Sequence, residues 1–230
     1  MRKFNYSSTV LRNATATAVD AGAYDGNNVL GIVREDFSIW ERRSPLCPHH
    51  VAELSKQGFK VLVQPCNKRI FTNVEYAEAG ATVQEDLSDA SLLLGVKQMP
   101  LHRLDKPRNY LFFSHVIKAQ PGNMPMLDHI NDTQCRLFDY ECITKDGKDG
   151  APRLVAFGKY AGIAGMIDGL QGLGQRLLAE GYSTPFLNVP TSHMYQNMDQ
   201  ARFTLRNVGA QVGSLAWVVL CTERGWILIY

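Results

Sequence analysis

Apolar residues gather in short runs along the chain, and each run has the length of a β-strand. The runs are NVLGIVRE (28–35), FKVLVQP (59–65), SLLLGVK (91–97), YLFFSH (110–115) and CRLFDYE (135–141). Runs such as SLLLGV show little alternation of apolar and polar residues, which is typical of strands covered on both faces. The pattern therefore predicts a sheet buried between two layers.

The segments between the first runs predict helices. Pro48 suits the first turn of a helix over 47–58, and Gly58 can end it. The stretch NVEYAEAG (73–80) predicts a second, shorter helix. Strands that alternate with helices indicate an α/β fold with a doubly wound, mostly parallel sheet of the Rossmann-like kind.

The second half of the chain has a different pattern. KDGKDG (145–150) is a strong turn signal and predicts a hairpin whose second strand is RLVAF (153–157). Residues 158–181 then predict one long helix that is rich in glycine, at a cost of roughly 1 kcal/mol per glycine relative to alanine. Such a composition indicates close backbone packing or a hinge. GLQGLG (169–174) lies inside this helix with the spacing G-x-x-G-x-G, so it is not the dinucleotide fingerprint.

Composition and charge exclude several classes of function. The 230 residues are 45% hydrophobic and carry a net charge of +2, which gives no reason to expect a nucleic acid or a membrane as a partner. No uninterrupted apolar run reaches the length of about 18 residues that a membrane-spanning helix needs. The five cysteines (47, 66, 135, 142 and 221) include no C-x-x-C pair, which predicts reduced thiols rather than a disulfide framework or a zinc site.

The N-terminal segment 1–26 differs from the rest. It contains Arg2, Lys3 and Arg12, many Ser, Thr and Ala residues, and no acidic residue before Asp20. This composition is typical of a mitochondrial presequence, and an ordinary disordered tail is the alternative. Folded structure is expected to begin near Asn27.

Two chemically capable side chains follow apolar runs. Lys97 stands at the end of SLLLGVK, and His115 stands at the end of YLFFSH. Ligands of open α/β sheets bind outside the carboxyl ends of the strands, where both side chains would lie if the two strands are neighbours. Histidine has an ordinary pKa of about 6.5, and burial can lower the pKa of lysine below its ordinary value of about 10.4. The two side chains therefore make a usable acid/base pair. Alternatively, Lys97 is a solvated strand end and His115 a hydrogen-bonded structural residue.

Three arginines crowd the polar segment between the first strand and the first helix. Arg34, Arg42 and Arg43 could bind the carboxylates of an anionic small molecule in bidentate fashion. The simpler alternative is that Arg34 and Arg42 pair with the nearby acidic residues Glu35, Asp36 or Glu41.

Other polar residues complete the candidate set. Lys118, Glu141 and Arg153 lie near other strand ends. His49 and His50 are adjacent on the predicted helix, where neighbouring side chains point about 100° apart, so no metal site is expected there.

The chain resembles a known enzyme family at several of these segments. They are VREDFSIWERRSPLCPHHV, LLLGVKQMP, YLFFSHVIKAQ, RLFDYECI and LVAFGKYAGIAGM, in this order. Together they are similar to the lysine-ketoglutarate reductase half of α-aminoadipic semialdehyde synthase. The similarity is more remote to fungal lysine-forming saccharopine dehydrogenase and to the N-terminal domains of alanine dehydrogenase and transhydrogenase. It covers roughly residues 28–214.

The resemblance implies an activity and a site. The family joins L-lysine and 2-oxoglutarate into an imine and reduces it with NADPH to saccharopine, in the first step of mitochondrial lysine breakdown in animals. By position, Lys97 and His115 match the family's acid/base pair. The groups that match its substrate site are Arg43, Lys118, Glu141 and Arg153, with Arg34 and Glu41 less clearly aligned.

The resemblance also implies a domain organisation. Residues 27–157 correspond to the N-terminal substrate domain, 158–181 to a connecting helix, and 182–230 to the start of a nucleotide-binding domain. AWVVLCTERGWILIY departs from the family pattern, and WVVLC and WILIY could form a hairpin around TERG. The second domain is therefore expected to be truncated, so NADP(H) belongs to the complete family enzyme and is not expected to bind this chain tightly.

Three hypotheses remain open from the sequence. The first is a lysine-ketoglutarate reductase, mitochondrial or else cytoplasmic, whose sequence is incomplete. The second is a non-catalytic fragment that binds lysine, 2-oxoglutarate or saccharopine, or that docks on full-length subunits or a second copy of itself. The third is a product that does not fold stably. A differently specific alanine-dehydrogenase-like enzyme is disfavoured by the lysine-specific segments.

Overall fold

The computed structural model describes residues 27–104, 108–147, 150–213, 219–221 and 227–229. It divides into two compact units, 1–142 and 143–230. The interpretation of 1–26 as a presequence or a tail lies outside the described residues. None of the helices in these ranges has the length and apolar character needed to cross a membrane.

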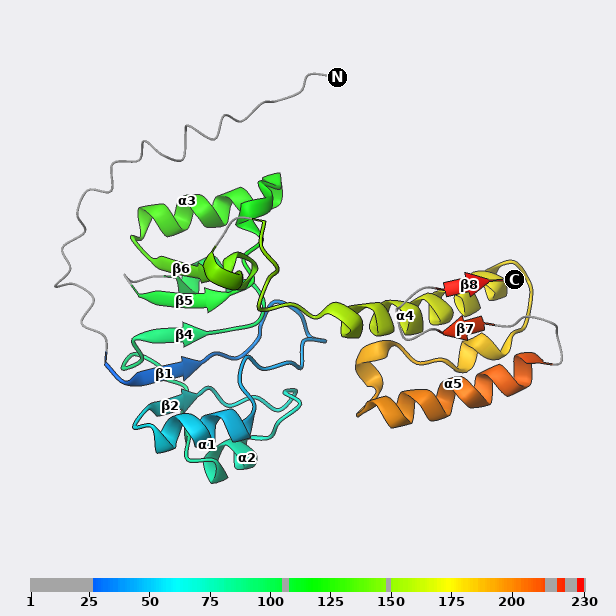
Figure 1. Cartoon of the computed structure of the whole chain (residues 1–230), viewed down its shortest axis with the longest axis horizontal. Helices are drawn as coiled ribbons and strands as arrows, with labels where there is room; N and C mark the ends of the chain where they lie inside the picture. Colours follow the sequence, from blue (N-terminus) through cyan, green and yellow to red (C-terminus); the bar gives the residue numbers. More distant parts are fainter. Residues whose placement is uncertain (1–26, 105–107, 148–149, 214–218, 222–226, 230) are drawn as a thin grey trace, which may run out of the picture. The chain divides into compact units, whose positions relative to one another are not determined.

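A six-stranded parallel sheet forms the centre of the first unit, and its strands point the same way (Figure 1). In spatial order the strands are β3 (Thr82–Val83), β2 (Lys60–Val63), β1 (Val29–Ile32), β4 (Leu92–Leu94), β5 (Asn109–Phe112) and β6 (Arg136–Asp139). Every neighbouring pair is parallel. The prediction of a doubly wound α/β fold is confirmed, and only the two-residue strand β3 was not predicted.

Helices cover both faces of this sheet. They are α1 (Pro48–Lys56), α2 (Asn73–Glu78) and α3 (Met124–Asp132). Successive residues of β2 enter different cores: Leu62 packs with Met126 and Ile130 of α3, whereas Val61 packs with Val51 of α1. This alternation gives two apolar cores and explains why the strands lack alternating polar residues.

Glycine and threonine fix the ends of the two predicted helices. Gly58 follows α1 with φ +88°, and Gly80 follows α2 with φ +94°, a conformation that favours glycine. Thr72 precedes α2, and its side chain accepts a hydrogen bond from the Glu75 amide at 3.2 Å. The helix boundaries read from the sequence are therefore confirmed.

The second unit contains α4 (Gly158–Ala179), α5 (Met198–Val212) and an antiparallel hairpin of β7 (Val219–Cys221) and β8 (Ile227–Ile229). The long glycine-rich helix and the C-terminal hairpin were both expected, whereas α5 was not. Its apolar core joins Ile167 of α4 to Ala201 and Val208 of α5.

One expectation about this unit needs correction. The hairpin predicted around 145–150 is reduced to one isolated antiparallel bridge between Thr144 and Arg153, and no strand forms over 153–157. Close packing explains Gly174, since a Cβ there would lie 2.7 Å from the Phe186 carbonyl carbon. It does not explain Gly162 or Gly165, around which the described structure leaves open space.

Candidate functional site

Lys97 and His115 follow adjacent strands of the first unit. β4 and β5 pair in parallel with Leu94 opposite Leu111, so the chain leaves both strands at the same carboxyl edge. The expectation that these strands are neighbours is confirmed. Two groups of charged side chains lie along this edge, one at the ends of β5 and β6 and the other at the ends of β1 and β4.

The first group joins a histidine, a lysine and a buried carboxylate. His115 Nδ1 lies 2.8 Å from Glu141 Oε2, and Lys118 Nζ lies 3.2 Å from Glu141 Oε1. Only 3% of the Glu141 side chain is exposed, whereas His115 and Lys118 are exposed to 31% and 43%. A buried carboxylate therefore holds two cationic or proton-carrying groups that face solvent.

The charge of Glu141 sets the tautomer of His115. Burial acts to raise the pKa of Glu141, but hydrogen bonds from His115 and Lys118 outweigh it, and the pKa lies below its usual value. An ionised carboxylate only accepts hydrogen bonds, so we assign the proton on His115 Nδ1 to this contact. Lys118 Nζ, 3.2 Å from the same nitrogen, then donates to Glu141. His115 Nε2 is left with a lone pair that can accept a proton from a ligand.

A second carboxylate fixes the two strand ends that carry this group. Asp139, the last residue of β6, accepts hydrogen bonds from the amide and the hydroxyl of Ser114 and, at 2.8 Å, from the Glu141 amide. His115 itself has φ +59°, in the left-handed region that residues other than glycine seldom adopt. Asp139 and Ser114 hold the backbone on either side of this conformation, so the position of the imidazole is specified by buried hydrogen bonds.

The second group is built around Glu35. Its carboxylate accepts hydrogen bonds from the Val96 amide at 2.6 Å and the Lys97 amide at 3.0 Å, which ties the end of β1 to the end of β4. Burial raises the pKa of Glu35, and these hydrogen bonds do not fully offset it. Lys97 Nζ lies 5.8 Å from the centre of the Phe37 ring. Glu35 therefore positions the backbone of Lys97 rather than its ammonium group.

Arg43 and Glu41 form a bidentate pair beside Glu35. Arg43 Nε and Nη2 lie 2.8 and 2.7 Å from the two oxygens of the buried Glu41 carboxylate. Burial acts to raise the pKa of Glu41, but Arg43, and more weakly Lys97, lower it below its usual value. Lys97 thus acts on Glu41 through its charge, whereas Arg43 contacts Glu41 directly.

The other predicted residues have partners of their own. Arg34 Nε lies 3.6 Å from Asp36, as the ion-pair alternative expected, and Arg34 Nη1 lies 2.8 Å from Glu85 Oε1, a partner that was not expected. Arg42 instead donates to the Lys68 carbonyl at 3.2 Å. Arg153 lies in the second unit and forms the bridge described above.

The comparisons with known proteins support the fold and identify the family. Residues 31–164 match the family described as alanine dehydrogenase/PNT, N-terminal domain. The chain belongs to this family. A solved structure of L-alanine dehydrogenase supports the same fold, with a TM-score of 0.51 and 20% identity over 66% of this chain and 42% of that one.

Two curated relatives extend the comparison beyond the alanine dehydrogenase/PNT family. The chain is 46% identical over 184 residues to mitochondrial alpha-aminoadipic semialdehyde synthase of Mus musculus, which covers 80% of this chain and 20% of that protein. It is 31% identical over 144 residues to saccharopine dehydrogenase (NAD(+), L-lysine-forming) of Yarrowia lipolytica, covering 60% and 38%. The resemblance found in the sequence is confirmed, and the chain spans about a fifth of the length of the mouse relative.

Sequence reasoning missed several residues that shape this family member's site. Asp139 and Ser114 stand at strand ends, a position that polar residues facing solvent share, so no signal in the sequence singles them out. Tyr140 packs against Phe113 with ring centres 4.9 Å apart, and burial raises its pKa to about 12. Arg69 is buried, its pKa is lowered by burial, and its Nη1 has no hydrogen-bond partner among the described residues.

The glycines of α4 do not fit a nicotinamide nucleotide. Gly169, Gly172 and Gly174 lie inside a continuous helix, rather than in a turn between a strand and a helix N-terminus. Their backbone amides are therefore used within the helix and cannot receive a pyrophosphate. The rejection of GLQGLG as a dinucleotide fingerprint is confirmed.

Proposed function

We propose that this chain forms the substrate-binding part of a lysine-ketoglutarate reductase, which condenses L-lysine with 2-oxoglutarate and reduces the product to saccharopine. The observation that carries the proposal is the His115–Glu141–Lys118 group beside Lys97 at one sheet edge. The identity to the mouse semialdehyde synthase and the lysine-forming yeast enzyme supports the choice of substrate. The process would be lysine catabolism.

The charges suit the substrates of this reaction. Lysine and 2-oxoglutarate together carry three carboxylates, and saccharopine retains all three. Lys97, Lys118 and Arg43 supply positive charge along the edge, and the guanidinium of Arg43 can bind a carboxylate in bidentate fashion. Arg34 and Arg153 remain further candidates for carboxylate binding, and Glu41 is proposed as the group that orients Arg43.

The reaction needs proton transfers that these residues can perform. The amine of lysine must lose a proton before it attacks the keto carbon of 2-oxoglutarate, and the carbinolamine must then lose water to become an imine. His115 Nε2 accepts the proton from the amine, since Glu141 holds the Nδ1 proton. Lys97 donates a proton to the leaving hydroxyl. In this proposal NADPH supplies the hydride, and the described residues offer it no glycine-rich turn.

The domain and cellular assignments belong to the same proposal. Residues 27–157 would form the substrate domain, 158–181 the connecting helix, and 182–230 the beginning of a nucleotide-binding region. The mitochondrial relative in mouse supports a mitochondrial location. The partners would be the small-molecule substrates, with a second copy or a longer subunit as a docking partner.

Two measurements on the purified chain test the function. The first follows the loss of NADPH absorbance with lysine and 2-oxoglutarate, against a chain that carries both Lys97→Ala and His115→Ala. The second measures saccharopine binding by isothermal titration calorimetry, again against this double variant, with circular dichroism to verify folding.

The outcomes separate the hypotheses. Turnover above the double variant supports the reductase. Binding that the double variant loses, without turnover, favours a non-catalytic substrate-binding or regulatory fragment. A folded chain that neither binds saccharopine nor oxidises NADPH would refute the assignment of the site.

A further inference from the structure

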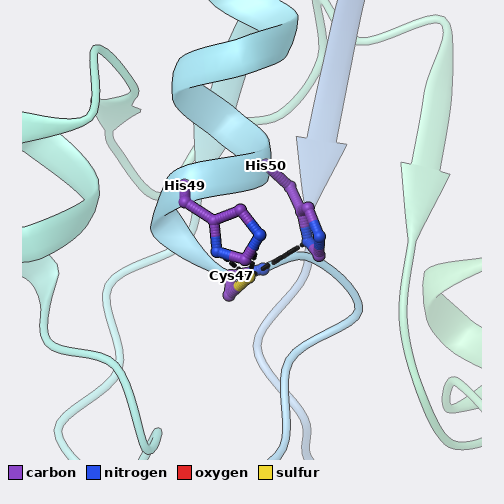
Figure 2. A group of neighbouring side chains, drawn as sticks. All are labelled: Cys47, His49 and His50. Atoms are coloured by element: carbon purple, nitrogen blue, oxygen red, sulfur yellow. Dashed lines mark hydrogen bonds between the residues drawn. The ribbon is translucent and has the colours of Figure 1, made fainter.

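A cysteine and two histidines converge at the N-terminus of α1, in the sequence Cys47-Pro48-His49-His50 (Figure 2). Cys47 Sγ lies 2.9 Å from His49 Nδ1 and 3.0 Å from His50 Nδ1. One ligand atom from each residue can be chosen so that all three lie within 4.8 Å of one another. We propose that Cys47, His49 and His50 bind a zinc ion, with a fourth coordination position open to solvent.

The structure corrects the expectation that the two histidines point apart. Their ring centres are only 3.9 Å from each other. Cys47 is not inside the helix but precedes it with an extended backbone (φ −90°, ψ 165°), so its side chain reaches back over the first turn. His50, three residues on, turns toward the same point, and its Nδ1 lies 3.5 Å from the Cys47 amide. His49 and His50 both belong to α1, so it is the orientation of their side chains toward Cys47 that brings the two rings together.

The backbone that carries the cluster is held in place from the core. Tyr76 is fully buried, and its hydroxyl lies 2.6 Å from the Leu46 carbonyl oxygen and 2.7 Å from Ser44 Oγ. Val51, on the first turn of α1, is also fully buried against the sheet. The residues on both sides of the three ligands are therefore fixed, which reduces the ordering that metal binding requires.

The ligand types and distances suit zinc. Zinc binds thiolate sulfur at about 2.3 Å and imidazole nitrogen at about 2.0–2.1 Å in tetrahedral geometry, which separates sulfur from nitrogen by roughly 3.5 Å. The present separations are about half an ångström shorter, so small side-chain rotations would admit the ion. Magnesium and calcium prefer oxygen ligands and fit this set poorly. His49 and His50 are exposed, which leaves room for water as the fourth ligand.

A simple helix cap is the competing explanation, because a sulfur atom can accept weak hydrogen bonds from imidazole N–H groups. The two explanations differ in their dependence on a thiolate. A cap holds the histidines without a metal, whereas the zinc site requires the sulfur as a ligand. The proposal is independent of the proposed enzymatic function, since it uses none of the residues assigned to the reaction.

Titration of the untagged full chain with cobalt(II) and zinc(II) tests the site. After metal is removed with a chelator, cobalt should produce a thiolate-to-metal charge-transfer band that zinc abolishes. Cys47→Ala should eliminate the band. His49→Ala and His50→Ala should each weaken zinc binding at least about tenfold in competition with a chromogenic chelator, because loss of even a supporting partner costs about 10–100-fold.

Matched variants decide the interpretation. Cys142→Ala and His102→Ala alter an exposed cysteine and an exposed histidine outside the cluster, and both should bind zinc as the unmodified chain does. Equal zinc affinity in the Cys47→Ala and Cys142→Ala proteins would overturn the proposal and leave adventitious surface binding. If Cys47→Ala does not fold by circular dichroism, the exposed His49→Ala variant decides alone.

Discussion

Glu141 and Glu35 occupy similar places and behave in opposite ways. Each follows a strand of the same parallel sheet, each is buried, and each accepts hydrogen bonds at the carboxyl edge. The pKa of Glu141 is lowered, whereas the pKa of Glu35 is raised. Glu141 meets His115 and Lys118, while Glu35 meets two backbone amides. Burial acts to raise the pKa of both carboxylates, and the hydrogen bonds from His115 and Lys118 outweigh it at Glu141, whereas the backbone amides do not outweigh it at Glu35.

The two glutamates therefore have different roles at the carboxyl edge of the sheet. Neighbouring titratable groups with pKa values pushed apart are an arrangement that acid/base sites use. Glu141 stays ionised and orients His115, which would accept the proton of the amine, and Lys118, which would supply positive charge. Glu35 aligns the backbone before Lys97, and its charge is less favourable. Substitutions at each glutamate and its partners can distinguish the two roles.

The largest expected effect comes from removing the Asp139 carboxylate, which holds the strand ends that carry His115 and Glu141. Asp139→Ala leaves the Ser114 amide, the Ser114 hydroxyl and the Glu141 amide without their acceptor in a buried site. We expect the free energy of unfolding to fall by about 3 kcal/mol, measured by urea denaturation. Asp199→Ala, at a side chain that is 89% exposed, should change it by less than about 0.5 kcal/mol. Equal losses in the two variants would mean that Asp139 does not tie the strand ends together.

His115→Ala tests the chemical role of the histidine that contacts Glu141. Turnover of lysine and 2-oxoglutarate is monitored through the loss of NADPH absorbance. We expect the turnover rate to decrease at least about 100-fold, because the variant lacks the imidazole that accepts the proton. The exposed His102→Ala serves as the control and should retain full turnover. Near-normal turnover of His115→Ala would remove this histidine from the mechanism.

The sequence predicted the strands of this edge better than the contacts made there. Unbroken apolar runs specify buried strands, and a chain that alternates strands and helices brings their carboxyl ends together, so Lys97 and His115 could be identified as candidates. Asp139 could not, because a carboxylate at a strand end looks the same whether it faces solvent or accepts three hydrogen bonds. The direction of the Glu35 pKa shift likewise depends on how far burial outweighs the hydrogen bonds from backbone amides, and only the folded chain determines that balance.

A pair of conservative variants compares the two glutamates directly. The stability that Glu141 contributes is present above its usual pKa of 4.5 and is lost as the pH falls through its lowered pKa. Glu35 has the opposite sign: its ionisation opposes folding at neutral pH, and that penalty disappears on acidification. At pH 7, Glu141→Gln should therefore lower the free energy of unfolding by about 1–2 kcal/mol, with the loss shrinking toward pH 3.

Glu35→Gln should lose a backbone hydrogen bond at every pH, but it also lacks the ionised carboxylate that opposes folding at neutral pH. The unmodified chain gains stability when Glu35 is protonated and the variant does not, so the difference in the free energy of unfolding between them should grow as the pH falls from 7 to 4. Chemical denaturation at several pH values measures both variants. Parallel pH profiles for Glu141→Gln and Glu35→Gln would contradict the contrast between the two sites.

The smallest expected effect comes from removing the Lys118 ammonium group beside Glu141. Lys118→Met keeps most of the aliphatic stem but removes the ammonium group 3.2 Å from Glu141 Oε1. Because the Lys118 side chain is 43% exposed, we expect a loss of only about 0.5 kcal/mol at pH 7, measured by urea denaturation. The loss should shrink toward pH 3 as the pH approaches the lowered pKa of Glu141, and Lys60→Met at an exposed position should show neither effect. A loss of the same size at both pH values would assign Lys118 a packing role and leave the hydrogen bond from His115 as the contact that lowers the pKa of Glu141.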